Sequence, residues 1–183
     1  MRVRQVESLA ELAAAWRLVA AILHQDDTHP RNYAFYAGHF PRHPELLLVA
    51  LAGGGGASAL AGAGPGGHEA GETLCGALLA HAEPDYVWIG KLTVAAGHRR
   101  RGAGSALLAL VERNAAAGGY GRLMLGAAPE AEAFYARHGY RPEHHRPPTG
   151  PPQRVFAKSR SRSTWVHDWA TRLRPEGLGR GRP

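Results

Sequence analysis

The spacing of apolar residues predicts an N-terminal strand followed by two helices. Residues 2–6 alternate polar and apolar side chains, which is typical of a half-buried strand. Ser8 and Glu11 form a Ser-x-x-Glu capping box, and the helix that it starts is expected to run to about His24. One face of that helix would carry Leu9, Leu12, Ala13, Trp16, Val19, Ala20 and Leu23. A second helix is expected over about residues 31–40.

Continuous apolar runs of strand length predict a buried sheet after these helices. They cover residues 46–52, 73–81, 86–94 and 122–126, and residues 154–158 are expected to add the last strand. The Gly-rich stretch that begins at residues 53–56 continues with more Gly and Pro where a nucleotide-binding helix would have to start. We therefore interpret it as a long hairpin loop.

Two further helices are predicted in the second half of the chain. Residues 106–111 form an apolar helical run after a Gly-rich turn. Pro129 suits the first position of another helix, and Gly139 is a typical residue just beyond a helix end. The predicted order is therefore β-α-α-β-β-β-α-β-α-β, which belongs to the α/β class.

Composition indicates one globular domain with a preference for anionic ligands. The chain has 183 residues, of which 44% are apolar, enough for one core and too few for two comfortable ones. No apolar stretch reaches about 18 residues and no signal peptide is apparent, so we expect a cytoplasmic protein without a membrane segment. The net charge of +7 favours a phosphate-bearing ligand or nucleic acid.

The most informative motif is the turn Arg99-Arg100-Arg101-Gly102-Ala103-Gly104-Ser105, between a strand and a helix. The two glycines leave successive backbone N–H groups open to an oxyanion, and the helix start adds its dipole. The arginines add charge-assisted donors. Neither the Walker spacing nor the third glycine of the Rossmann fingerprint is present. The sequence therefore predicts a phosphate-binding turn of another kind.

A second motif, Ala131-x-x-Phe134-Tyr135-x-x-x-Gly139-Tyr140, follows the strand over 122–126. Together with Lys91-Leu92-Thr93-Val94 and Arg99-x-x-Gly102-x-Gly104, it resembles the GNAT superfamily of acyl-CoA-dependent N-acetyltransferases. The resemblance covers residues 1 to about 158, and its specific part is residues 91–140.

This resemblance implies the GNAT fold, a mixed central sheet of six to seven strands with helices on both faces, in a domain of residues 1–158. It implies acetyl-CoA as the acyl donor, with the N–H of Val94 holding the thioester oxygen. Tyr135 would protonate the departing CoA sulfur, because a phenol keeps its proton at neutral pH. The residues expected to hold the cofactor are Leu92, Thr93, Val94, Arg99, Arg100, Arg101, Gly102, Ala103, Gly104 and Ser105. Residues 159–183 are expected to form a basic extension with a short docking helix and a frayed tail.

The sequence departs from the family pattern at the expected general base. Relatives often carry a carboxylate on the strand before the turn, where this chain has Trp88, Ile89, Gly90 and Lys91. The nearest alternatives are His81, Glu83 and Asp85, unless the proton leaves through water. Ala128 also replaces an Asn that commonly binds the cofactor arm, and Ala96 and Gly97 replace a Pro and an acidic residue.

The binding site of the acceptor amine is expected near the loop between the first two helices. In the GNAT fold, which the sequence resembles, this loop borders the acceptor site. Asp26 or Asp27 would bind an ammonium group there. Tyr33 and Trp88, with Phe35 and Tyr36, would either line the cleft or belong to the core. The segment from His24 to His29 contains metal-type ligands but has no third converging segment, so we predict no metal site. Cys75 lies in an apolar run and is expected to be a buried thiol.

The favoured hypothesis is an N-acetyltransferase that passes acetyl directly to a primary amine of a small molecule or peptide, in a protein that is compatible with a homodimer. The alternative is a non-catalytic acyl-CoA-binding module, which would not need the carboxylate base that this sequence lacks. A nucleic-acid-binding protein is less favoured, because the basic clusters at 99–101 and 158–162 contain no interleaved aromatic residues.

Overall fold

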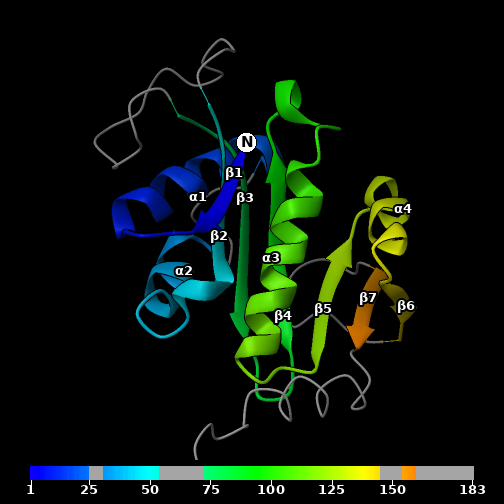
Figure 1. The fold of residues 1–183 in the computed structure, drawn as a ribbon. Coiled ribbons are helices and arrows are strands. Elements are labelled where there is room, and N and C mark those ends of the chain that lie inside the picture. Colours follow the sequence, from blue (N-terminus) through cyan, green and yellow to red (C-terminus); the bar gives the residue numbers. More distant parts are fainter. Residues whose placement is uncertain (25–30, 54–71, 145–153, 160–183) are drawn as a thin grey trace, which may run out of the picture.

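The computed structural model describes residues 1–24, 31–53, 72–144 and 154–159, which form one mixed sheet with helices on both faces (Figure 1). The sheet has seven strands in the order β1-β2-β3-β4-β5-β7-β6. The elements are β1 (Arg2–Gln5), α1 (Leu9–Leu23), α2 (Tyr33–His39), β2 (Leu47–Ala52), β3 (Thr73–Ala82), β4 (Val87–Val94), α3 (Ala103–Ala117), β5 (Arg122–Ala127), α4 (Pro129–Arg137), β6 (Arg141–Glu143) and β7 (Arg154–Ser159). The predicted fold class is thereby confirmed.

The two faces of the sheet bury separate clusters of apolar side chains. On one face, Leu107, Leu108 and Val111 of α3 pack with inward residues of β2 to β5 and with Tyr135 of α4. In Figure 1, α3 crosses in front of the sheet on this side. On the other face, Leu12, Trp16 and Val19 of α1 and Tyr36 of α2 pack against β2 and β3. Because successive strand residues point to opposite faces, β2 and β3 contribute side chains to both clusters.

The pairing of β4 positions an opening in the sheet. β4 and β5 are the one parallel pair among the described strands, and they pair only where Val87, Trp88 and Ile89 face Leu123, Met124 and Leu125. β4 continues to Val94, so its residues 90–94 have no partner on β5. On its other edge β4 pairs with β3 and carries a bulge: Leu79 faces Lys91, whereas Ala80 faces Ile89, which leaves Gly90 as the extra residue.

Several predicted boundaries need correction. Sequence reasoning missed β6, a strand of three residues that contains a proline and is too short to show periodicity. Leu46 lies in the short 3₁₀ helix Pro44–Leu46 instead of a strand, because Pro44 suits the start of a helical turn. Leu9 and Leu23, predicted on the buried face of α1, are 48% and 40% exposed. They occupy its first and last positions, beyond the central turns that the sheet covers.

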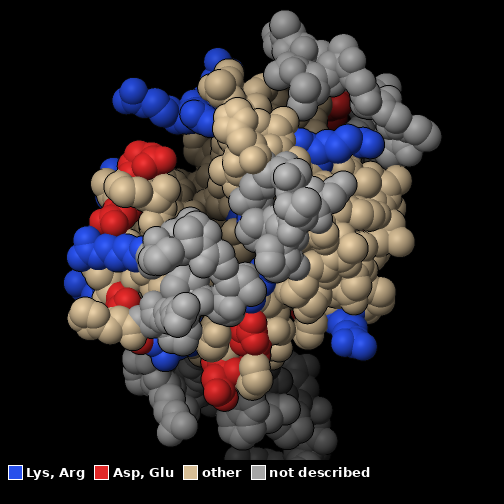
Figure 2. Space-filling view, turned by 180° about the vertical axis from the view of Figure 1, so that it is seen from behind, with Lys and Arg blue, Asp and Glu red and all other residues tan. Residues whose placement is uncertain are grey.

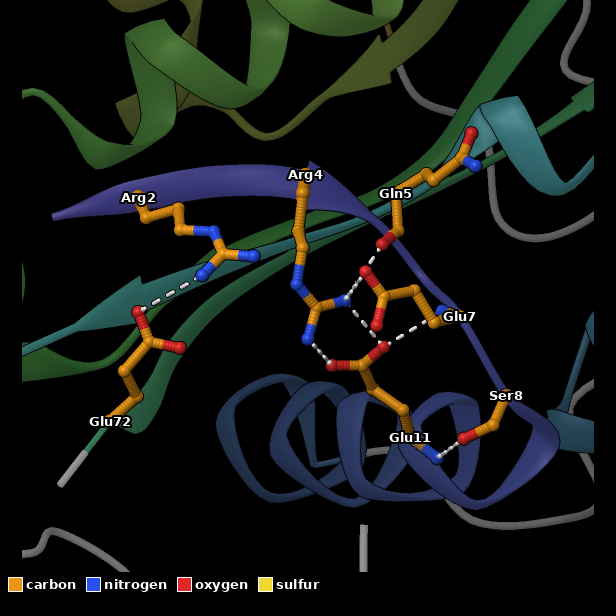
Figure 3. A network of polar contacts seen from close by, with 7 residues as sticks. All are labelled: Arg2, Arg4, Gln5, Glu7, Ser8, Glu11 and Glu72. Atoms are coloured by element: carbon orange, nitrogen blue, oxygen red, sulfur yellow. Dashed lines mark hydrogen bonds and ion pairs between the residues drawn. The ribbon is translucent and has the colours of Figure 1, made fainter. Parts of the chain in front are cut away.

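The capping box at the start of α1 is formed only in part. The Ser8 hydroxyl accepts the N–H of Glu11 at 3.1 Å, as predicted. The Glu11 carboxylate does not reach back to Ser8; it binds the Arg4 guanidinium at 2.8 and 2.7 Å and accepts the N–H of Glu7 at 2.8 Å (Figure 3). Since Glu11 is only 3% exposed, this bidentate pair supplies the charge compensation that a buried carboxylate requires.

Candidate functional site

The Gly-rich turn leads directly into α3 and presents a helix start. Gly102 has φ +85° and is the residue before the helix, a conformation that favours glycine. The first intrahelical bond is donated by Ala106 to the Gly102 carbonyl at 2.9 Å. The N–H groups of Ala103, Gly104 and Ser105 therefore have no acceptor within the helix and can bind an anion.

This turn lies between β4 and α4. A β-carbon on Gly104 would contact Phe134 Cζ at 3.4 Å and Val94 Cγ2 at 3.8 Å. The Nε of Arg99 donates to the Val94 carbonyl at 3.0 Å, which ties the turn to the end of β4. Arg100 and Arg101 are exposed, as is Gly102. The structure thus brings the helix start, the basic side chains and the unpaired end of β4 together.

The strand residues predicted to hold the cofactor do not share one face. Leu92 and Val94 pack with the cluster under α3. Thr93 points to the opposite face and is 4% exposed, and its hydroxyl has no hydrogen-bond partner among the described residues. Leu92 and Val94 therefore border the α3 side of the opening, and Thr93 borders the other side.

Tyr135 lies on α4 next to Phe134, whose ring also contacts the turn. Their ring centroids are 5.1 Å apart, and the ring centroid of Tyr140 lies 6.0 Å from that of Tyr135. Tyr135 is 8% exposed, and this burial raises the pKa of its phenol to about 12. The phenol therefore keeps its proton at neutral pH. As predicted, α4 starts at Pro129 and is followed by Gly139 at φ +83°.

A polar cluster lies on the α1–α2 face, at the end of β3. His81 Nε2 is 3.1 Å from Glu83 Oε1, and Arg31 lies 3.5 Å from the same oxygen. Burial of the ring, with Arg31 and His39 nearby, lowers the pKa of His81 well below its usual value. A neutral ring gives its single N–H to Glu83, and in the part of the chain that the structure describes Nδ1 has no partner. Glu83 is therefore engaged by two groups.

Lys91 is a buried cation that the sequence analysis did not single out. It is 6% exposed on the same face, and among the described residues no carboxylate forms an ion pair with it. Burial, with Arg31 nearby, lowers the pKa of Lys91 to about 8. The signal that could have revealed it is a lysine inside the apolar strand 86–94, because such a position is buried on both faces of the sheet.

The residues predicted for the acceptor site have different positions. Trp88 is 4% exposed and packs with Met124 and Val155, so it belongs to the core. The Tyr33 hydroxyl donates to the Leu9 carbonyl at 3.4 Å, which links α2 to α1. Asp26 and Asp27 lie outside the described residues, as does the predicted extension from residue 160 onward. The base candidates His81 and Glu83 contact each other, and Asp85 follows them in the turn between β3 and β4.

The single cysteine takes no part in this arrangement, and the metal-type residues Asp26, Asp27 and His29 lie outside the described residues. Cys75 is fully buried on β3, donates to the Ala50 carbonyl at 3.3 Å, and has its pKa raised mainly by burial. Among the described residues, no group of three His, Cys, Asp or Glu side chains could hold a metal. None of the helices in the described part of the chain combines the length and apolarity needed to cross a bilayer.

Comparison with known proteins decides the family. A sequence profile of the acetyltransferase (GNAT) family matches residues 16–140, which include the turn, the opening at β4 and Tyr135. The chain belongs to the GNAT acetyltransferases. The resemblance that the motifs indicated is thereby confirmed. No curated protein sequence matches this GNAT chain.

Solved structures share the GNAT fold at low sequence identity. A structure of the NatC complex bound to Gag peptide and CoA matches with TM-score 0.64 at 16% identity, covering 87% of this chain and 98% of that one. An aminoglycoside 6'-N-acetyltransferase complexed with coenzyme A matches with TM-score 0.60 at 14% identity, covering 87% and 97%. Ard1 from Thermoplasma volcanium matches with TM-score 0.59 at 16% identity, covering 85% and 93%. At such identities these likenesses support the fold alone.

Proposed function

We propose that this protein transfers the acetyl group of acetyl-CoA directly to a primary amine. The observation that carries the proposal is the opening at β4. Residues 90–94 have no partner on β5, and the helix start at Gly102 and the helix of Tyr135 both lie beside that unpaired end. An extended acyl chain can bind such a strand through its free backbone groups while its phosphates bind the helix start.

The residues around the turn fit a pyrophosphate. The N–H groups of Ala103, Gly104 and Ser105 point out of the start of α3, and Arg100 and Arg101 are exposed beside them. A bound acetyl-CoA would supply the thioester carbonyl for acyl transfer. The backbone N–H of Val94 would donate to the oxygen of that carbonyl.

Proton donation is assigned to Tyr135. Because its pKa is raised to about 12, the phenol holds a proton at neutral pH that it can give to a thiolate. A covalent acyl-enzyme step is disfavoured, since the Cys75 thiol is fully buried and its pKa is raised. Direct transfer to the amine is therefore the simplest chemistry for these residues.

The acceptor class is tested by turnover. The named relatives include one bound to a peptide and one named for an aminoglycoside, so both kinds of amine belong in the panel. Purified protein is mixed with acetyl-CoA and peptide N-termini, amino acids, polyamines or aminoglycosides, and thiol release is measured. We expect release above the acceptor-free rate with one class. Background rates with every amine, in a protein that binds acetyl-CoA, would contradict the proposal.

A non-catalytic acyl-CoA-binding role is the second candidate, because β4 carries no carboxylate base. It predicts acetyl-CoA binding without turnover. Nucleic-acid binding is less favoured. Figure 2, which views the molecule from behind the sheet of Figure 1, shows Lys and Arg side chains scattered among Asp and Glu on that face instead of gathered in one patch.

A further inference from the structure

Four buried polar groups face the α1–α2 side of the sheet around the bulge of β4. Tyr36 is 0% exposed, His81 2%, Thr93 4% and Lys91 6%. Among the described residues, Tyr36 Oη, His81 Nδ1 and Thr93 Oγ1 have no hydrogen-bond partner. Buried polar atoms are nearly always hydrogen-bonded, so a group of unpartnered ones on one face points to a ligand or to water that binds there.

This group lies on the side from which an acceptor would approach. The turn at Gly102 and Tyr135 lie on the α3–α4 side, so a bound acyl donor occupies that side of the opening. The acceptor must reach the carbonyl carbon from the other side. Lys91 is two residues beyond Ile89, where the pairing of β4 with β5 ends, and it therefore lies within the open section of β4.

The charged groups around Lys91 do not favour its protonated form. From the α2 side come Arg31, Tyr36 and His39, and only Arg31 among them is a permanent charge. From β3 comes His81 with Glu83, whose carboxylate is shared between His81 and Arg31. The carboxylate that α1 buries is Glu11, which binds Arg4. Lys91 therefore lies near the positive charge of Arg31, and no carboxylate among the described residues forms an ion pair with it.

We propose that the side-chain amine of Lys91 is the general base that takes a proton from the acceptor ammonium. This inference rests on the proposed acetyl transfer and assigns the base that the strand otherwise lacks. Its pKa of about 8 lies near the operating pH, where a base is both free to accept a proton and strong enough to hold it. An arginine at this position could not do so, because a guanidinium stays protonated.

The protons balance over one turnover. Neutral Lys91 Nζ takes one proton from the ammonium, and the free amine forms the new C–N bond as the C–S bond breaks. The sulfur takes the Tyr135 proton, and the second proton lost by the nitrogen restores the phenol. Lys91 then releases its proton to water. The net products are the acetamide, free CoA and one proton.

The protonation state of Lys91 can be measured without substrate. The sequence contains two lysines, Lys91 and Lys158, so carbon-13 labelling of lysine gives two side-chain signals. A Lys158→Met variant assigns the signal of Lys91. We expect that signal to titrate with a midpoint near pH 8 in the folded apoprotein. A midpoint at or above the usual 10.5 would overturn the proposal.

Kinetics then distinguish whether Lys91 acts as a general base or only as a positive charge. With the best amine of the panel, Lys91→Met and Lys91→Arg should each lower kcat/KM by about 100-fold or more at pH 7.5. With a fluorinated analogue of the same amine, which is already uncharged at that pH, the loss should be only a few-fold. Lys158→Met is the control, because Lys158 lies on β7 and binds Glu112. This variant should keep the wild-type rate with both amines.

Three results would overturn the assignment of Lys91. Wild-type activity in Lys91→Arg would mean that the charge, not the base, matters. Equal losses with both amines would indicate a structural role. Acetyl found on Lys91 after incubation with acetyl-CoA alone would make it a nucleophile. Absence of turnover in the wild-type protein with every amine refutes the acetyl transfer itself, and the base with it.

Discussion

The hydroxyl of Tyr36 occupies the space that a side chain on Gly90 would need. A β-carbon built on Gly90 would overlap Tyr36 Oη, and Tyr36 is fully buried between α2 and the sheet. Gly90 is also the extra residue of the β4 bulge. The packing of α2 against the sheet and the shape of β4 at the opening therefore depend on one another.

We expect Gly90→Ala to destabilise the protein by about 1–3 kcal/mol, the usual cost of overpacking a well-filled core. Removing the clashing hydroxyl should relieve it, so Gly90→Ala with Tyr36→Phe should recover much of the loss. Urea unfolding of the two single variants and the double variant measures this coupling. Additive effects would show that the hydroxyl is not the obstacle.

Gly104→Val should weaken acetyl-CoA binding by at least tenfold while the protein stays folded. A β-carbon there already meets Phe134 at 3.4 Å, and the two further methyl groups would fill the helix start. Calorimetric titration gives the affinity, and circular dichroism reports the fold. Gly121→Val is the matched control, because Gly121 has open space around it and lies beyond the other end of α3. Unchanged affinity in Gly104→Val would refute the phosphate-binding role of the turn.

Tyr135→Phe should lower kcat by about 100-fold and leave the acetyl-CoA affinity nearly unchanged. The ring packing against Phe134 and Tyr140 is preserved, and only the proton donor is lost. Single-turnover rates measure the chemical step directly. Tyr120→Phe serves as the control, since Tyr120 only packs at the edge of the core. A wild-type chemical rate in Tyr135→Phe would remove this residue from the mechanism.

Lys91→Met should be more stable than the wild-type protein at pH 7, and the difference should shrink toward pH 9.5. The pKa of Lys91 is about 8 when folded against 10.5 ordinarily, so the unfolded chain binds more protons between these values. The lysine therefore costs stability below pH 8, of the order of 3 kcal/mol, and this cost disappears as pH rises. Thermal unfolding across this range tests the sign. Lys91→Arg keeps the buried charge and should show no gain.

Arg4→Met should destabilise the protein by about 3–5 kcal/mol, because it removes the guanidinium that binds both oxygens of the buried Glu11 carboxylate. Replacing both members, Arg4→Met with Glu11→Leu, should restore most of the stability. Arg2→Met is the comparison, since Arg2 is 49% exposed and lies 3.9 Å from Glu72, and it should cost less than about 1 kcal/mol. Denaturant midpoints measure these differences in stability. Equal losses of stability in Arg2→Met and Arg4→Met would contradict the prediction.

The sequence by itself determined the features that local chemistry controls. The order of helices and the long strands follows from apolar spacing, the start and end of α4 from Pro129 and Gly139, and the turn before α3 from Gly102. Each of these depends on residues a few positions apart. The family resemblance could be stated for the same reason, since its motifs are short segments of contiguous chain.

Tertiary structure decided what depends on distant partners. The bulge at Gly90 is a feature of the register of β4 on β3, and the hydroxyl of Tyr36 lies against it; neither leaves a periodic signal in the sequence. The same register turns Lys91 and Thr93 to the α1–α2 face, and the short pairing with β5 opens the strand beside them. Trp88, which sequence alone could assign to a cleft or to the core, is buried because Met124 and Val155 arrive from neighbouring strands. The burial of a side chain and its electrostatic environment depend on residues that are far apart in the chain. Only the folded arrangement therefore defines them.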